Sequence, residues 1–509
     1  MSGFRTVIHI LVFSILGVCG LSACTEAGQT PSAHPVAGVA LPLTFSSVSF
    51  EESSNVPKEH CRFTAARRDT FGAGRQVLIH TGSTLPSQTT GLCTVDEGEH
   101  TGNDSLVLVH EDIITGALEA AAGTVVSGSV TNEHPLASAE GFVAEPLTPL
   151  ATRISNGVGL GEYWRLPAAP AVPTVAWAAP HGGEIEPGTD EELAALNISA
   201  TDTRNAYWGV IGDMEPNGAA DHWHITAGDV SEFSFEGLQR LRAHSYTYAV
   251  SFHGFTNSQI PEPVLVGGAE ALEFRQSVAS VLEHEVRVRH NGTFLDALAM
   301  DLRDCDANSN HASCKYKKYG GRDEDNFVNE LPTSGRGLQL EQTTTARNTY
   351  GGTLARGVKS VLDCLLDAPD RAFQNSNPAA TSMSVDDTGL ILTTGACPYF
   401  VGELEVLHGA AQRWAFRTSV SCGTGSCTGL LGRVDAYGNN ADGTWTWVGG
   451  GELSSTIVSG SSRLVSDTTL DHPASTSRRY RFVVRASNKV SPPAAPVLQR
   501  GISVTGTLQ

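Results

Sequence analysis

A glycine-rich turn between a strand-like run and a helix-like run constrains this chain most. The turn, His181–Asp190, has the sequence HGGEIEPGTD. It follows the apolar run 172–180, which is typical of a buried strand, and precedes the segment 191–196, which favours a helix start. We therefore expect His181 and Glu186 on a tight turn at the carboxyl end of a strand, the edge where open α/β sheets place their chemistry. An imidazole and a carboxylate are two of the three protein ligands that a catalytic zinc usually takes.

Strand and helix patterns alternate around this turn, from about residue 165 to residue 367. The alternation predicts an α/β domain with a mostly parallel or mixed open sheet. The expected strands are 173–179, 206–211, 245–252, 263–266 and 337–342, and the expected helices are 190–198, 235–243, 268–284 and 352–365.

The two flanking regions have a different sequence pattern, in which short apolar runs alternate with turn residues. Residues 43–164 are expected to form a small β-rich domain, and residues 368–509 a β-sandwich-like domain. The proline-rich run 167–173 marks the boundary between the first two domains.

The first residues are typical of an export signal rather than of a fold. Arg5 precedes an apolar run from Val7 to Val18, which is too short to span a membrane stably. The following Leu-Ser-Ala-Cys resembles the bacterial lipoprotein cleavage box, which implies cleavage before Cys24, acylation of its thiol and a tether over 24–42. The alternative is an ordinary secretory signal in which Cys24 is incidental. The predicted location is the cell envelope, facing the periplasm or the exterior, with the lipid as the one membrane contact.

The cysteines after Cys24 indicate disulfide bonds, and the net charge restricts the kinds of molecule that the chain can bind. An even number of cysteines in an exported chain indicates disulfides, and spacing favours local pairs: Cys61–Cys93, Cys305–Cys314, Cys364–Cys397 and Cys422–Cys427. A formal net charge of −20 argues against a nucleic-acid partner. We expect a monomer.

Two later histidines are candidates for the metal site. His253 lies at the end of the strand-like run 245–252 and is followed by glycine. Alone it is more typical of a hydrogen-bonded strand terminus, but with the turn His181–Asp190 it becomes the expected third ligand. His224, within Asp221–Thr226, is an alternative ligand, a donor behind the ligands or a core histidine.

A carboxylate that could act as a base lies late in the same region. Gln339 and Glu341 alternate with leucines, so both polar side chains share one face of a strand. A carboxylate at such a strand end could deprotonate a metal-bound water. The alternative is a solvated edge strand.

These elements occur in the order found in the poly-γ-glutamate hydrolases, which the region 165–367 resembles. The matching elements are HGGxIExGTxE from His181, His-Ile-Thr from His224, His253-Gly254, the pair Asn326 and Asn329, and GxQLE from Gly337 followed by Arg347. The resemblance implies a zinc-dependent amidohydrolase with a carboxypeptidase-like fold, zinc ligands His181, Glu186 and His253, and Glu341 as general base. It departs from the family at Glu184, a position that is usually glycine, and in an inserted segment over 305–322.

The implied substrate is a γ-linked glutamate polymer, in which each unit carries a free α-carboxylate. We expect Arg336, Arg347, Asn329, Gln339 and His224 to contact it. The inserted segment adds a basic cluster, Lys315, Lys317, Lys318 and Arg322, which suits a polyanion or is a solvated loop. Two alternatives remain open: a zinc amidase or carboxypeptidase on cell-wall peptides, and a non-catalytic surface-binding lipoprotein.

Overall fold

The computed structural model divides the chain into two compact units, Met1–Pro42 and Leu43–Gln509. The described residues all belong to the second unit, so the predicted signal peptide, the tether and Cys24 lie outside them. They are 43–81, 90–132, 137–140, 159–167, 173–198, 201–213, 218–256, 263–301 and 312–367, together with the strands between 373 and 508.

The N-terminal β-rich region is a closed barrel with strand order β1-β5-β2-β4-β3-β6. Its interior is apolar, with Phe50, Phe63, Val77 and Ile79 fully buried. The strands are β1 (Thr44–Glu52), β2 (His60–Phe63), β3 (Gln76–Thr81), β4 (Thr90–Glu99), β5 (Leu106–Val109) and β6 (Val126–Thr131), with the short helices α1 (Ala65–Phe71) and η1 (Ile113–Ala117).

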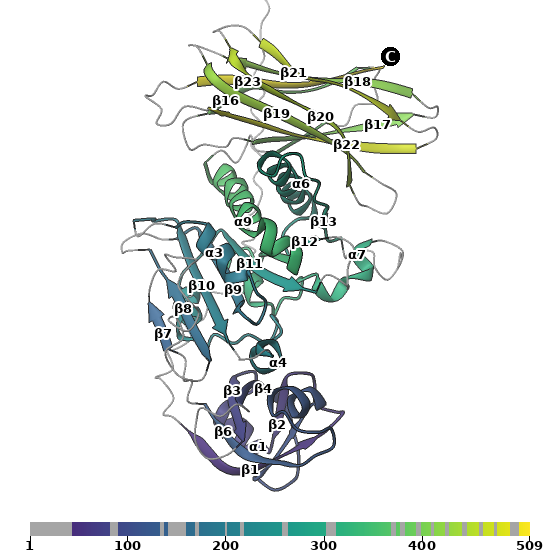
Figure 1. The fold of residues 1–509 in the computed structure, drawn as a ribbon. Coiled ribbons are helices and arrows are strands. Elements are labelled where there is room, and N and C mark those ends of the chain that lie inside the picture. The colour runs from purple at the N-terminus through teal and green to yellow at the C-terminus, as the bar shows by residue number, and fades with distance from the viewer. Residues whose placement is uncertain are drawn as a thin grey trace, which may run out of the picture. The chain divides into compact units, whose positions relative to one another are not determined.

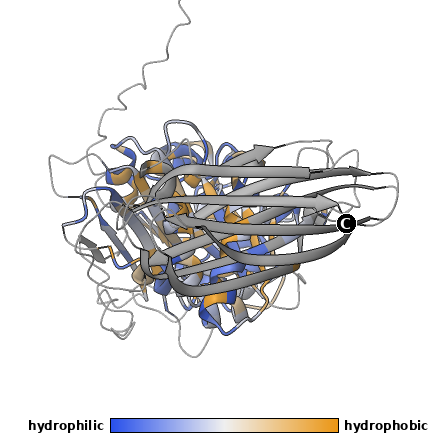
Figure 2. Cartoon of the chain, turned by 90° about the horizontal axis from the view of Figure 1, so that it is seen from above, coloured by the Kyte–Doolittle hydropathy of each residue, from blue (hydrophilic) through white to orange (hydrophobic). Residues whose placement is uncertain are grey.

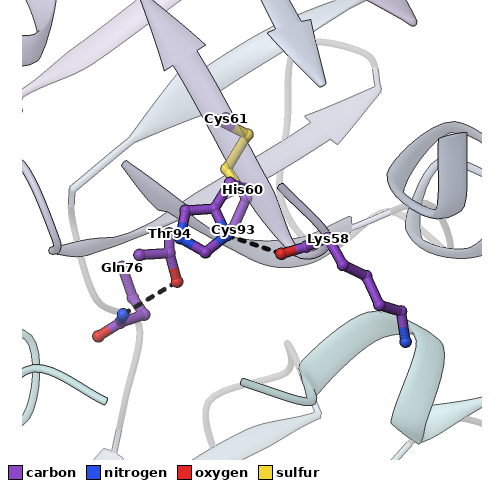
Figure 3. The surroundings of a disulfide bond; sticks show 6 residues. All are labelled: Lys58, His60, Cys61, Gln76, Cys93 and Thr94. Carbon is purple, nitrogen blue, oxygen red and sulfur yellow. Dashed lines mark hydrogen bonds between the residues drawn. A yellow bond between two sulfur atoms is a disulfide. The ribbon is translucent and has the colours of Figure 1, made fainter. Parts of the chain in front are cut away.

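A disulfide joins two strands of this barrel. Cys61 of β2 is bonded to Cys93 of β4, the pair expected from spacing, and both are buried (Figure 3). Cys314 is also disulfide-bonded, but Cys305, its predicted partner, lies outside the described residues. Cys397 lies outside them too, and the side chains of Cys364, Cys422 and Cys427 are not described.

The central region is a mixed α/β domain built on one sheet of order β13-β12-β14-β11-β9-β10-β8-β7. Strands β10, β9, β11 and β14 are parallel neighbours, while β8 and β12 run antiparallel to β10 and β14 respectively. The strands are β7 (Ala137–Glu140), β8 (Leu160–Arg165), β9 (Val175–Gly183), β10 (Asn205–Gly212), β11 (Tyr248–Phe255), β12 (Val264–Gly267), β13 (Ala297–Ala299) and β14 (Leu338–Thr343).

Helices cover both faces of this sheet, because successive strand residues point to opposite sides. Trp177 belongs to a core formed with α3 (Thr189–Ala195), α6 (Leu272–Arg289) and α9 (Thr344–Asp367). Its neighbours Ala176 and Ala178 belong to a second core, which contains residues of α4 (Ala219–Trp223), α5 (Glu236–Arg242) and α8 (Phe327–Glu330). In Figure 1, α6 and α9 lie side by side. Figure 2 shows hydrophobic and hydrophilic stretches interspersed along the coloured part of the chain.

The predicted boundary between residues 164 and 165 differs from the structure, in which β7 and most of β8 lie before it and belong to the central sheet. Glu162 explains why β8 is hard to predict, because a buried carboxylate interrupts its apolar pattern. This side chain accepts hydrogen bonds from Trp208 Nε1 at 2.7 Å and from the Gly237 backbone N–H at 2.7 Å. It thus serves the amino end of α5, whose first N–H groups have no partner within the helix.

The C-terminal region consists of a five-stranded and a four-stranded sheet, in agreement with a β-rich domain. The first has the order β15-β17-β22-β19-β20 and the second β16-β23-β18-β21. The strands are β15 (Phe373–Ser376), β16 (Ser382–Leu392), β17 (Tyr399–His408), β18 (Gln412–Cys422), β19 (Cys427–Asn439), β20 (Trp445–Ile457), β21 (Ser462–His472), β22 (Thr476–Asn488) and β23 (Leu498–Leu508).

The five-stranded sheet contacts α6 through a buried polar pair. His284 Nδ1 lies 2.7 Å from Asp435 Oδ2, and neither side chain is exposed. Arg287 Nε lies 3.4 Å from the same carboxylate. Within the described part of the chain, no helix is both long enough and apolar enough to cross a membrane.

A buried carboxyl in α3 generates a pH-dependent contribution to stability. Burial raises the pKa of Glu192 to about 8, although a hydrogen bond from Gln342 and the charge of Arg347 lower it. Because the folded-state pKa lies above the unfolded value near 4.5, the contribution is complete below pH 4.5 and is lost as pH rises through 8.

We expect Glu192→Gln, which keeps the shape of the neutral acid, to reduce the fall in Tm between pH 5 and pH 9. Thermal unfolding across that range measures it, with Glu97→Gln on the exposed surface of β4 as control. Parallel Tm curves for Glu192→Gln and the unaltered protein would show that Glu192 does not titrate in this range.

Candidate metal centre

A tight turn after β9 places His181 and Glu186 together. The pairing of β9 with β10 shifts between Ala179–Gly209 and Gly182–Ile211, so β9 has one extra residue at Pro180-His181. Such a bulge re-aims a side chain at a strand end. Gly183 then adopts φ +70°, and a Cβ there would lie 2.5 Å from the Gly212 carbonyl oxygen. Only glycine fits this close approach.

Hydrogen bonds within the turn fix its shape. The Glu186 N–H donates to the His181 carbonyl at 2.9 Å, and the Gly183 N–H donates to Asp190 Oδ1 at 2.9 Å. The hydroxyl of Thr189 donates to the His181 carbonyl at 3.1 Å. The turn is therefore closed by its own residues and holds the Glu186 side chain beside the His181 ring.

Three potential ligand atoms converge at this point. His181 Nδ1 lies 3.1 Å from Glu186 Oε2. His253 Nδ1 lies 3.3 Å from His181 Nδ1 and 4.0 Å from Glu186 Oε2. The two rings are buried, and the Glu186 side chain is 12% exposed. The structure thus brings together the three residues for which the sequence predicts metal binding.

Two of these side chains are fixed by further hydrogen bonds. His181 Nε2 lies 2.8 Å from the Ile225 carbonyl oxygen, to which it donates when Nδ1 is the ligand atom. Glu186 Oε2 accepts the Gly254 N–H at 2.8 Å. Among the described residues, His253 Nε2 is buried without a hydrogen-bond partner.

Burial and the charges of this cluster together favour the protonation states that metal ligands require. Burial alone would raise the pKa of Glu186, but the charge and hydrogen bond of His181 outweigh it and bring the pKa to about 2. Burial, followed by the charge of His181, lowers the pKa of His253 to about 3. At neutral pH Glu186 is therefore ionised and His253 is neutral, which are their metal-binding forms.

Glu341 lies next to His253 because β11 and β14 run parallel in register. His253 is paired with Glu341, and Ser251 is paired with Gln339. Glu341 Oε1 accepts a hydrogen bond from Gln339 Nε2 at 2.8 Å, and Gln339 Oε1 accepts one from Asn326 Nδ2 at 2.7 Å. Burial, and then the charge of Glu186, raise the pKa of Glu341 well above its usual value. Both polar side chains share the strand face that the sequence predicts.

Arg347 fastens the ligand turn to the end of β14. Its Nε donates to the Pro187 carbonyl at 2.8 Å, and its Nη1 donates to the Gln342 carbonyl at 2.5 Å. A Cβ on Gly254 would lie 1.4 Å from Nη1, so this glycine makes room for the guanidinium. Arg347 is 5% exposed, and these two hydrogen bonds are to the protein backbone. The sequence predicts substrate contact for it, which stays a prediction, and these hydrogen bonds position the turn.

Asn329 and Arg336, two further residues predicted to contact substrate, lie in different surroundings. The Asn329 side chain donates to the Gly321 and Asp323 carbonyls and accepts from the Ala269 and Gly337 N–H groups. These four bonds use the hydrogen-bonding capacity of its amide in ordering the loops. Arg336 is exposed, and its charge lowers the pKa of Glu270, although burial of that carboxyl keeps the pKa raised.

His224 joins the cluster from the end of α4. Its ring centroid lies 4.2 Å from that of His181, and its Nε2 lies 3.8 Å from Glu186 Oε1. His181, Glu186 and His224 by themselves form a group that could hold a metal ion. The sequence leaves the role of His224 open, and the structure places it against the ligands.

Glu59 also lies at this site, although the sequence alone does not indicate it. Glu59, in the N-terminal barrel, has Oε1 2.8 Å from His224 Nδ1. Burial alone would raise the pKa of Glu59, but the hydrogen bond from His224 and its charge bring the pKa to about 2. Burial alone would lower the pKa of His224. The hydrogen bond to Glu59 and the charge of Glu59 outweigh burial, so the pKa of His224 is raised. No motif surrounds Glu59, and it lies in a different sequence region from the ligands.

Comparison with known proteins supports the motif assignment. Residues 159–357 match the model of the family described as poly-gamma-glutamate hydrolase. A comparison with curated proteins finds no match. Solved structures that match include the pre-peptidase C-terminal domain of a Bacillus anthracis collagenase, at 8% identity and a TM-score of 0.15, over 27% of this chain and 96% of that one. CorA, a surface-associated copper-binding protein of Methylomicrobium album BG8, matches at 10% identity and a TM-score of 0.16, over 27% of this chain and 98% of that one.

An aminopeptidase from a marine sediment archaeon of the Thaumarchaeota matches at 10% identity and a TM-score of 0.16, over 73% of this chain and 99% of that one. TM-scores this low do not establish a shared fold. The family match covers the turn, all three histidines, Glu341 and Arg347. The similarity to the poly-gamma-glutamate hydrolase family thus lies in the central part of this chain, residues 159–357.

Proposed function

We propose that the central domain is a zinc-dependent hydrolase that cleaves the γ-glutamyl amide bonds of poly-γ-glutamate. The observation that carries this proposal is the convergence of His181 Nδ1, Glu186 Oε2 and His253 Nδ1 beside Glu341, at the carboxyl ends of parallel strands. The family match supports the hydrolase class.

The donor set fits zinc. Tetrahedral zinc with bonds of about 2.0–2.2 Å separates its ligand atoms by roughly 3.3–3.6 Å. The three separations here, 3.1, 3.3 and 4.0 Å, bracket that range. Two imidazoles and one carboxylate are also a usual catalytic zinc set. When bound, the ion would polarise the amide carbonyl and lower the pKa of a water toward about 7.

Glu341 is the proposed general base. It would take a proton from the attacking water and deliver it to the leaving amine. Gln339 holds one carboxylate oxygen, which orients the other. The raised pKa of Glu341 suits this task, since a base with a pKa nearer to neutral both accepts and returns a proton readily.

A basic segment beside the base would favour an anionic substrate. Lys318 acts on Glu341 electrostatically and lowers its pKa, against the effect of burial and Glu186. A Cβ on Gly321 would lie 2.4 Å from Gln339 Oε1, so this segment abuts the side chain that holds Glu341. In a chain with a net charge of −20, local cations here would offset repulsion of free α-carboxylates. We assign Lys315, Lys317, Lys318 and Arg322 this role.

Two alternatives follow from the sequence. Cell-wall peptides also contain γ-linked glutamate, so an amidase or carboxypeptidase acting on them would need the same chemistry. A non-catalytic binding lipoprotein would need neither the ligand set nor a buried base, and the geometry disfavours it. We further propose that the enzyme is anchored in the cell envelope through a lipid on Cys24.

Incubation of the zinc-loaded protein with poly-γ-glutamate, and separately with cell-wall stem peptides, tests the substrate. We expect the polymer to be shortened, with new amino groups released. Product sizing distinguishes internal cleavage, which gives oligomers, from terminal cleavage, which gives monomers. Cleavage of stem peptides alone would favour the cell-wall alternative, and cleavage of neither would favour a binding protein.

We expect Glu341→Gln to lower kcat by about 10²- to 10⁴-fold, because the amide keeps the shape but cannot accept the proton. Glu184→Gln is the matched control, since Glu184 lies in the ligand turn with an exposed side chain. Rates at equal zinc occupancy are the measurement. Full activity of the Glu341→Gln enzyme would place the base elsewhere.

We expect one zinc per chain, and a chelator should lower Tm, because a ligand that binds only the folded state stabilises it. The stabilisation is roughly 2.7 kcal/mol at a free zinc concentration of 100 times Kd. Elemental analysis and thermal unfolding, with and without added zinc, measure this effect. In His181→Ala the response of Tm to zinc should disappear; an undiminished response would mean that the metal binds elsewhere.

A further inference from the structure

A carboxylate from the N-terminal barrel reaches the proposed metal centre. Glu59 Oε1 lies 2.8 Å from His224 Nδ1, while Oε2 accepts the Thr226 N–H at 2.8 Å and its hydroxyl at 3.1 Å. Both oxygens are therefore engaged by the segment that carries His224. Glu59 lies outside residues 159–357, so the family's own domain does not supply this side chain.

The local backbone of the barrel fixes Glu59 in place. This residue has φ +63°, a conformation that costs energy for a non-glycine residue. Its carbonyl oxygen accepts the Thr94 N–H at 2.9 Å. On either side, the His60 ring donates to the Lys58 carbonyl at 2.6 Å, and Cys61 is tied to Cys93 (Figure 3). Strained backbone held by surrounding bonds is a recurrent feature of functional positions.

Further contacts hold the barrel segment against the central domain. Gln76 Nε2 donates to the Asp229 carbonyl at 2.6 Å, and the Gln76 N–H donates to Ser234 Oγ at 2.8 Å. Leu78 and Leu92 of the barrel share one apolar core with Trp223 and Ile225. The Glu59–His224 contact is therefore part of a packed interface.

The contact determines what the His224 ring presents to the site. A carboxylate accepts a hydrogen bond from Nδ1–H, which leaves the Nε2 lone pair of the neutral ring directed away from Glu59. Nε2 lies 3.8 Å from Glu186 Oε1, on the side of the metal ligands. A carboxylate behind an imidazole is the usual way in which proteins fix the tautomer and orientation of a ring at a metal site.

We propose that the N-terminal barrel is a working part of the hydrolase site, in which Glu59 is a positioning residue that fixes the tautomer and orientation of His224. This inference rests on the proposed function, because the ring is oriented toward the proposed zinc ligands. The barrel then contributes to catalysis by completing a site that the central domain builds only in part.

The first test measures the tautomer of the His224 ring directly and does not depend on enzymatic activity. Histidine ring nitrogens are labelled with ¹⁵N in the metal-free full-length protein, and spectra are recorded at pH 9, well above the ordinary pKa of an imidazole of about 6.5. His224→Gln assigns the signals. We expect the Nδ1–H tautomer in the unaltered protein, a mixture of tautomers in Glu59→Ala, and an intermediate spectrum in Glu59→Gln, whose amide oxygen still accepts a hydrogen bond. Glu97→Gln, on exposed barrel surface, should leave the spectrum unchanged.

The second test measures kcat and KM on poly-γ-glutamate for the same variants at equal zinc occupancy. We expect Glu59→Ala to lower kcat by about 10- to 100-fold with little change in KM, Glu59→Gln to lower it less, and Glu97→Gln to match the unaltered enzyme. An unchanged tautomer in Glu59→Ala, or a changed tautomer with unchanged kcat, would overturn the inference. A protein that shortens no poly-γ-glutamate would fail the proposed function alone, since the ring signals still test Glu59.

Discussion

The site depends on the parallel pairing of β9, β11 and β14, which brings the carboxyl ends of three strands to one edge of the sheet. Register places His253 beside Glu341. The bulge at Pro180-His181 precedes the turn that places Glu186 beside His181. A slip of one residue in β14 would send Glu341 to the opposite face. The backbone of this sheet therefore determines whether the proposed ligand His253 and the proposed base Glu341 can act together.

Arg347 shows how tightly this edge is built. Its guanidinium links the turn that carries Glu186 to the end of the strand that carries Glu341. Gly254 provides the space directly after His253, where any side chain would collide with the guanidinium. Three motifs that are far apart in the sequence thus meet in one packed contact, which gives a physical reason for the His-Gly and Arg elements.

Local pattern predicts most of this edge. The apolar run before His181, the alternation around Gln339 and Glu341, and the glycines after each histidine are short-range signals, and they place the donors at strand ends. Strand β8 escapes prediction because the buried carboxylate of Glu162 interrupts its apolar pattern. Hydrogen bonds from Trp208 of β10 and Gly237 of α5 make this burial possible. Asn329 looks like a substrate contact in the sequence because polarity alone does not reveal that backbone groups occupy its amide. Glu59 escapes prediction for a different reason, since its contact with His224 forms only when the barrel packs on the central domain.

We propose that His181, Glu186 and His253 hold one catalytic zinc ion. A crystal structure of the zinc-loaded protein, with anomalous scattering measured on both sides of the zinc edge, tests it most directly. We expect one zinc peak within about 2.0–2.2 Å of His181 Nδ1, Glu186 Oε2 and His253 Nδ1. A zinc ion bound by His181, Glu186 and His224, with His253 turned away, would contradict it.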